Sequence, residues 1–222
     1  MTNEAPTAIH FERSLNWLDT NRQKLTRIAV VVAVVALAAS YYFWNQAQQE
    51  AAASAALSDV PPGAGAAEAH LKLAAKYPKT SAAPRAVLVA AGDLFAAGKL
   101  PEAETQFKRL LDEYSESPFR VQGLLGVAAC LDAQGKIPDA VTRYEQIVAR
   151  YPKEAVASQA KSALARLYEI QNKPAQALPL YEELQRTEAY SSFGLEANIR
   201  RLALLAKHPE LAKAKAPTAS LK

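Results

Sequence analysis

A pattern that recurs every 37 residues constrains the fold of this 222-residue chain more than any other feature. Gly98, Gly135 and Asn172 are separated by this interval, and so are several small, aromatic and aliphatic residues. The aligned sets are Ala103, Ala140 and Ala177; Phe107, Tyr144 and Tyr181; and Leu110, Ile147 and Leu184. The same step leads back to Ala66, His70 and Leu73. A fixed period of this size is typical of a solenoid with one structural unit per repeat.

Each period predicts a pair of helices. A residue that tolerates the left-handed conformation, such as Gly135, ends the first helix. A proline a few residues later, such as Pro138, begins the second, where its missing N–H has no cost. In that second helix Ala103, Phe107 and Leu110 fall at i, i+4 and i+7, which forms one buried stripe. Since strand signals are nearly absent, the sequence predicts an all-α fold in which each hairpin buries its apolar face against the next.

The pattern resembles the tetratricopeptide repeat. That motif has a small residue in the middle of its first helix, where Ala91, Ala128 and Ala165 stand in this chain. It has a second small residue twelve positions later and an aromatic residue four positions after that, and both occur here in all three full units. The resemblance covers residues 80–187, and residues 64–79 as one further second helix. The resemblance implies a tetratricopeptide-like helical-hairpin solenoid, which the apolar run described next places after an N-terminal transmembrane helix.

A second feature is the apolar run from Ile28 to Trp44, in which only Ser40 is conventionally polar. A membrane-spanning helix needs about 20 apolar residues, with about 17 as the lower limit. The aromatic rings that end the run suit the headgroup region of a bilayer. A cleaved leader is the alternative, because small residues precede the aromatic rings. The 26 residues before the apolar run and the bulky aromatic residues at its end favour an uncleaved anchor.

The charges around the run predict its orientation. Arg13, Arg22, Lys24 and Arg27 precede it, and no Lys or Arg follows until Lys72. Basic residues stay on the cytoplasmic side of a membrane. We therefore predict a single-pass protein of the bacterial inner (plasma) membrane, with its N-terminus inside, residues 28–44 in the bilayer and its C-terminal domain in the periplasm.

The chain is expected to have five parts. These are a cytoplasmic segment at 1–26, the transmembrane anchor at 27–45, a helical stalk or degenerate first repeat helix at 46–63, a tetratricopeptide-repeat domain at 64–208, and a flexible tail at 209–222. Within the repeat domain, second helices are expected near 64–77, 101–114, 138–151 and 175–187, and a capping helix at 191–207.

The sequence gives little indication of catalysis. The single cysteine, Cys130, lies on an apolar helix face and is expected in the core, and His70 takes a position that is aromatic in the other units. The nucleotide-binding, metalloprotease and serine-hydrolase motifs do not occur. The net charge of +4 comes without a basic cluster, so nucleic acid is not expected as a partner. We predict no catalytic, cofactor or metal site and no small-molecule substrate, and keep an enzyme as a third class of function.

Proteins with such repeats bind through the concave surface of their first helices, so the repeat pattern predicts which residues line a protein-binding groove. The mixed apolar and polar lining suits extended or unfolded segments. The nine predicted groove residues are Arg85, Leu88, Phe95, Gln122, Leu125, Asp132, Gln159, Arg166 and Glu169.

The order of these features along the chain indicates a more specific family. The segment "NWLDTNRQKL" leads into one span that ends in "YYFWNQ", and the repeats follow. This is similar to the YfgM-like ancillary subunits of the SecYEG translocon. The resemblance implies a chaperone-like periplasmic protein whose partners are Sec translocon subunits and exported polypeptides. The repeat rhythm is also similar to scaffolds of outer-membrane assembly and of cell-envelope division, which is the alternative function.

Overall fold

The computed structural model describes residues 6–63 and 65–214, and these residues form ten α-helices and no strand. This confirms the all-α fold that the repeat predicts. The chain divides into two compact units, Met1–Ala52 and Ala53–Lys222, which are described separately below.

Most of the first unit is helix α1 (Pro6–Ser58), whose last six residues belong to the second unit. The apolar side chains of its middle part are exposed, with Val31, Val35 and Leu37 at 61%, 62% and 71%. Among the described residues it is the one helix long and apolar enough to cross a membrane. The expected cytoplasmic residues 1–5 lie outside the described part of the chain.

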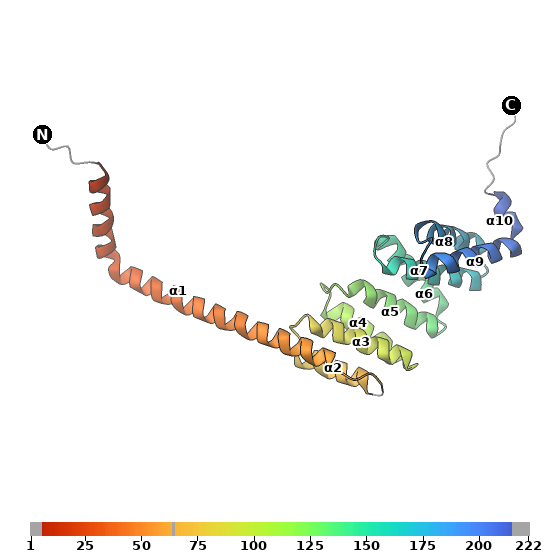
Figure 1. Ribbon diagram of the computed structural model, residues 1–222, viewed down its shortest axis with the longest axis horizontal. Coiled ribbons are helices and arrows are strands. Elements are labelled where there is room, and N and C mark those ends of the chain that lie inside the picture. Colours follow the sequence, from red (N-terminus) through yellow and green to blue (C-terminus); the bar gives the residue numbers. More distant parts are fainter. Residues whose placement is uncertain (1–5, 64, 215–222) are drawn as a thin grey trace, which may run out of the picture. The chain divides into compact units, whose positions relative to one another are not determined.

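The second unit is a series of helical hairpins in which each helix packs against the next one along the chain (Figure 1). The first helices of successive hairpins, α3, α5, α7 and α9, also contact one another. The helices are α2 (Ala66–Lys76), α3 (Ala82–Ala96), α4 (Leu100–Glu113), α5 (Arg120–Ala133), α6 (Ile137–Arg150), α7 (Val156–Ile170), α8 (Pro174–Thr187), α9 (Ser192–Lys207) and α10 (Pro209–Ala214).

The residues at the 37-residue interval end the first helices as predicted. Gly98, Gly135 and Asn172 have φ angles of +73°, +72° and +55°. In each turn the N–H of the following lysine donates to a carbonyl oxygen five residues back, as Lys136 does to Leu131 at 2.9 Å. This is the Schellman arrangement, which satisfies carbonyl groups that a helix end would otherwise leave without a donor.

The small residues of the repeat are the points of closest packing. All six of them have no exposed surface, and the aromatic and aliphatic residues that recur at the 37-residue interval in the second helices are at most 6% exposed. An alanine at such a point lets two helices approach, and the larger side chains fill the space beside it. The six are Ala91, Ala103, Ala128, Ala140, Ala165 and Ala177.

The end of α1 takes part in this packing. Ala53 is fully buried in a cluster with Ala83 and Val87 of α3, and Leu57 packs against the same cluster. Residues 53–58 therefore lie where a first helix would precede α2, which is the position expected for a degenerate first repeat helix.

The C-terminal residues differ from the expected flexible tail. Pro209 begins the short helix α10, just as Pro174 begins α8, and Leu211 packs against the core. The low apolar content of this segment suggested a tail, but one leucine is enough to hold its first turns on α9. Residues 215–222 lie outside the described part of the chain.

Candidate protein-binding groove

The nine predicted groove residues all lie on the first helices. Three belong to α3, three to α5 and three to α7. All except Arg166 fall at equivalent positions in successive units. Their exposure differs along each helix. Arg85, Gln122 and Gln159, which occupy the same slot in the three units, are all exposed.

The apolar residues of the predicted groove are more buried than the repeat pattern indicated. Leu88 and Phe95 are half-buried and pack against the core, and Leu125 is only 8% exposed and belongs to it. The sequence pattern identified their helix face, but it could not show how closely the neighbouring helices cover that face. Leu125 therefore offers almost no surface to a partner.

The charged members near the ends of α5 and α7 are engaged within the protein. Arg166 forms an ion pair with Asp132 of the preceding unit. Glu169 accepts a hydrogen bond from the Tyr181 hydroxyl and lies 3.9 Å from the Arg200 guanidinium. Burial and this carboxylate both raise the pKa of Tyr181, so its hydroxyl stays a donor at neutral pH. The two ion pairs, of Arg166 with Asp132 and of Arg200 with Glu169, link successive units, so these groove charges are already paired within the protein.

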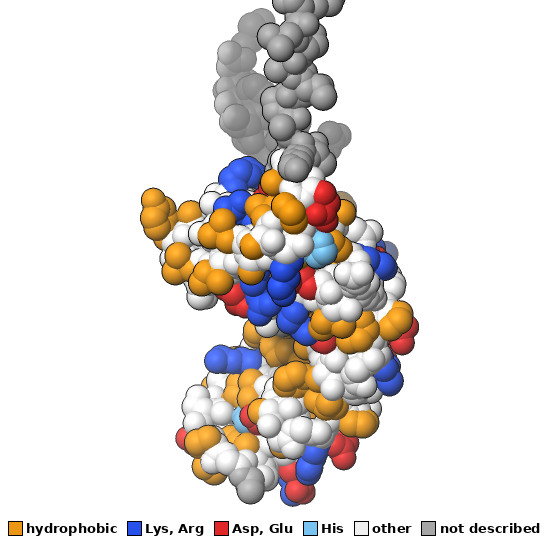
Figure 2. Space-filling model, turned by 90° about the vertical axis from the view of Figure 1, so that its right-hand side faces the viewer, with side chains coloured by type: hydrophobic (Ala, Val, Ile, Leu, Met, Phe, Trp, Pro, Cys, Tyr) orange, Lys and Arg blue, Asp and Glu red, His pale blue; other side chains and the backbone are white. Residues whose placement is uncertain are grey.

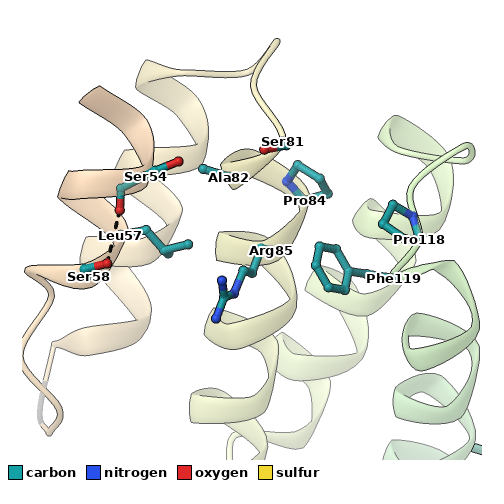
Figure 3. A pocket seen from close by; sticks show the side chains of 9 residues that line it. All are labelled: Ser54, Leu57, Ser58, Ser81, Ala82, Pro84, Arg85, Pro118 and Phe119. Atoms are coloured by element: carbon teal, nitrogen blue, oxygen red, sulfur yellow. Dashed lines mark hydrogen bonds between the residues drawn. The ribbon is translucent and has the colours of Figure 1, made fainter. Parts of the chain in front are cut away.

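A pocket of about 410 Å³ opens beside Arg85, at the N-terminal end of the solenoid. Three segments build it: the last residues of α1, the first turn of α3, and the loop before α5. In Figure 3 the Arg85 side chain lies between Leu57 and Phe119. The lining residues are Ser54, Leu57, Ser58, Ser81, Ala82, Pro84, Arg85, Pro118 and Phe119.

The pocket combines one positive charge with apolar and hydroxyl groups. No carboxylate lines it, and Arg85 makes no ion pair with any described residue. The Ser58 hydroxyl donates to the Ser54 carbonyl oxygen at 3.2 Å, while the Ser54 side chain stays exposed. Such a lining can accept an apolar side chain together with a backbone carbonyl or a carboxylate.

Sequence reasoning identified Arg85 but missed most of its neighbours. The repeat interval could have identified Ser54 and Leu57, because they lie two steps of 37 residues before Ala128 and Leu131. Pro118 and Phe119 lie in a loop between units, where the helical periodicity gives no information. On the face shown in Figure 2, which looks onto the C-terminal side of the solenoid, side chains of both charges and hydrophobic side chains lie around a hollow.

The other reactive side chains form no catalytic arrangement in the described part of the chain. Cys130 is fully buried, and burial raises the pKa of its thiol to about 11, so it is protonated and inert at neutral pH. The Nδ1 atom of His70 lies 3.2 Å from the carboxylate of Asp93, which links α2 to α3. Within the described residues, no three His, Cys, Asp or Glu side chains are grouped as metal ligands.

Comparison with protein families supports the repeat assignment. A family model described as a tetratricopeptide repeat-like domain matches residues 16–121. A second, described as a tetratricopeptide repeat, matches residues 88–155 and 131–192. The chain therefore contains tetratricopeptide-repeat-like domains, which define a protein–protein interaction module. The comparison with curated proteins gave no match.

Solved structures show the same fold at low identity. A putative kinesin light chain from Podosopora anserina with nearly identical TPR-like repeats is 18% identical, with a TM-score of 0.54 over 77% of this chain and 90% of that one. A tetratricopeptide repeat protein from Parabacteroides merdae is 15% identical, with a TM-score of 0.52 over 67% and 56%. BtubC from P. vanneervenii is 20% identical, with a TM-score of 0.51 over 73% and 66%.

Proposed function

We propose that this chain is a membrane-anchored, chaperone-like ancillary subunit of the Sec translocon, which binds exported polypeptides in the periplasm. The N-terminus lies in the cytoplasm and residues 28–44 cross the inner membrane. Three observations support this topology: an exposed apolar helix of sufficient length, basic residues close to its N-terminal side with none on the other side before Lys72, and a family match that runs from residue 16 through the apolar run into the repeats.

The pocket beside Arg85 is the observation that carries the proposed activity. Its apolar walls and single free cation suit an extended chain, whose backbone and side chains offer both apolar groups and carbonyl oxygens. A folded partner would require a larger complementary surface. Because unfolded segments vary in sequence, a mixed lining serves them better than a site for one charged motif.

The short connection to the anchor supports a role close to the membrane. Ten residues separate Trp44, at the end of the apolar run, from Ser54 in the pocket. Even fully extended, a connection of this length spans at most about 36 Å. Polypeptides that emerge from a secretion channel are concentrated within that range, so weak affinity is sufficient through effective concentration.

Photocrosslinking in native membranes tests this function. A photoreactive amino acid at Arg85 or Gln122, both exposed on first helices, should capture exported polypeptides in transit or subunits of the translocon. Leu125 is unsuitable because it is buried. The matched control is Ala149, an exposed residue of the second helix α6, which should capture neither.

The alternative function is a scaffold for outer-membrane assembly or for the cell-envelope and division machinery. It predicts a different set of captured proteins. If the probes at Arg85 and Gln122 capture only assembly factors or cell-wall enzymes, the translocon proposal is wrong and the scaffold is right.

A further inference from the structure

Helix α9 at the C-terminal end of the solenoid is apolar on two opposite sides. Its inner side packs on the core through Gly194, Ala197 and Leu204, which are buried. Its other side carries a row that we call the outer seam. The outer seam consists of Leu195, Ile199 and Leu202, which are 59%, 68% and 54% exposed, and the exposed Ala206.

An exposed seam of this kind is unusual at the end of a repeat array. Terminal repeats normally have a polar outer face that keeps the protein soluble, and a helix that is apolar on both sides is normally buried. The same four slots are buried or half-buried in the preceding first helices α3, α5 and α7, whether they hold apolar residues, as in α3, or mostly polar ones, as in α7. Among these first helices, the exposure of all four slots is therefore specific to α9.

No described residue of the repeat unit covers this seam. Helix α10 has six residues and packs through Leu211 against the core, and the three large residues of the seam stay more than half exposed. After residue 214 the sequence contains one large apolar residue, Leu221. One leucine cannot cover three large side chains spread over two turns of helix.

The spacing of the seam identifies the partner that fits it. Its residues follow one another at intervals of four, three and four, which is the a/d pattern of a coiled-coil seam. The pattern is also symmetric, since the pair Leu195 and Ala206 and the pair Ile199 and Leu202 share one midpoint, between Arg200 and Arg201. A twofold axis through this midpoint places each residue opposite the other member of its pair in a second copy.

We propose that the outer seam of α9 is a homodimer interface, in which two copies of the chain pack their α9 helices antiparallel. Leu195 of one copy packs on Ala206 of the other, a large side chain on a small one, and Ile199 packs on Leu202. A twofold interface must be self-complementary in this way, because the same patch serves both copies.

The interface is small, so we expect it to depend on the membrane. Three large side chains per copy bury less than the approximately 1,200 Å² of a standard stable interface. Two copies anchored in one bilayer meet at a high effective concentration, which compensates for weak affinity. This step rests on the proposed anchoring, whereas the geometry of the seam does not.

Disulfide crosslinking of the full chain in phospholipid vesicles tests the pairing. In the antiparallel dimer the two copies of residue 199 are about 4.5 Å apart along the helix axis, and those of residue 206 about 16 Å. Mild oxidation should therefore crosslink Ile199→Cys to itself but leave Ala206→Cys monomeric. A mixture of Leu195→Cys and Ala206→Cys should form a mixed dimer. The native Cys130 is buried and gives little background.

A charge in the seam supplies the control for specificity. Leu202→Glu in the Ile199→Cys chain should reduce the crosslinked fraction at least tenfold without changing the helical content, because Leu202 is mainly exposed. Equal crosslinking of Ala206→Cys and Ile199→Cys, or none for Ile199→Cys, would overturn the proposal. Capture of polypeptides at Arg85 is measured separately in the Leu202→Glu chain, so a failed dimer and a failed client site are distinguishable.

Discussion

Single residues with positive φ decide where the first helices of this solenoid end. At Gly135 the left-handed conformation allows the chain to turn after α5 and begin α6 within a few residues. A Cβ atom added there would meet no other atom within 4 Å. Any effect of a side chain at this position would therefore come from the backbone conformation alone.

Two glycine substitutions should have opposite effects for this reason. Gly135→Ala forces an alanine into the left-handed region and should destabilise the protein by about 1–2 kcal/mol. Gly92→Ala, inside helix α3 with no neighbour near its Cβ, should stabilise it by about 0.5–1 kcal/mol. Chemical denaturation of the full chain in mild detergent measures both, and a stabilising Gly135→Ala would contradict the assigned turn.

These turns could be predicted because the 37-residue interval aligned two glycines and one asparagine. The close approach of α4 and α5 at Gly126 could not be predicted. A Cβ atom there would lie 2.4 Å from the ring of Phe107, so α4 and α5 pack too closely for a side chain at this point. That distance depends on how two helices cross, and the period of one helix carries no information about it.

At the scale of helices, pairs of alanines set the separation within each hairpin. Ala128 of α5 and Ala140 of α6 are both fully buried in the main core cluster. The neighbouring Tyr144 and Ile147 fill the rest of the space and leave no room for expansion.

A larger residue at either alanine should therefore overpack the hairpin. Ala128→Leu or Ala140→Leu should each reduce the free energy of unfolding by about 1–3 kcal/mol. The matched control is Ala149→Leu on the exposed side of α6, which should have little effect. If the thermal unfolding of both core variants equals that of the wild type, the packing described here is wrong.

The pocket beside Arg85 shows what helix-scale prediction omits. Periodicity placed Arg85 on the open face of α3 because its slot is polar in the other units too. It could not bring Phe119 to the same place, because Phe119 belongs to a loop and reaches the pocket only through the stacking of two units. Sites assembled from several segments follow from the tertiary arrangement.

At the scale of the whole molecule, the proposed anchor would determine where the repeats act. The apolar run and the asymmetric basic residues are local features, so the sequence alone predicts the span and its direction. The binding partner could not be predicted in this way. The groove residues belong to three helices, and two of them, Asp132 and Arg166, form an ion pair with each other within the fold.

An uncleaved anchor predicts the N-terminus of the mature protein. Mass spectrometry of protein purified from membranes should find Met1 or Thr2 at its start, because the run ends in bulky rings that signal peptidase sites lack. A start between Ser40 and Ala47 would show that the run is a leader. The repeat domain would then be released from the membrane.

A repetitive chain has a specific way to misfold, in which one unit is skipped and the next docks in its place. The alanine slots do not prevent this, because they are alike in every unit. The ion pair between Arg166 of α7 and Asp132 of α5 is not alike: the residues 37 positions earlier are Ala129 and Phe95. If the hairpin of α7 and α8 docked on α3 in place of α5, Arg166 would face Phe95, and Asp132 would lose its partner. This pair therefore favours the correct order of units during folding.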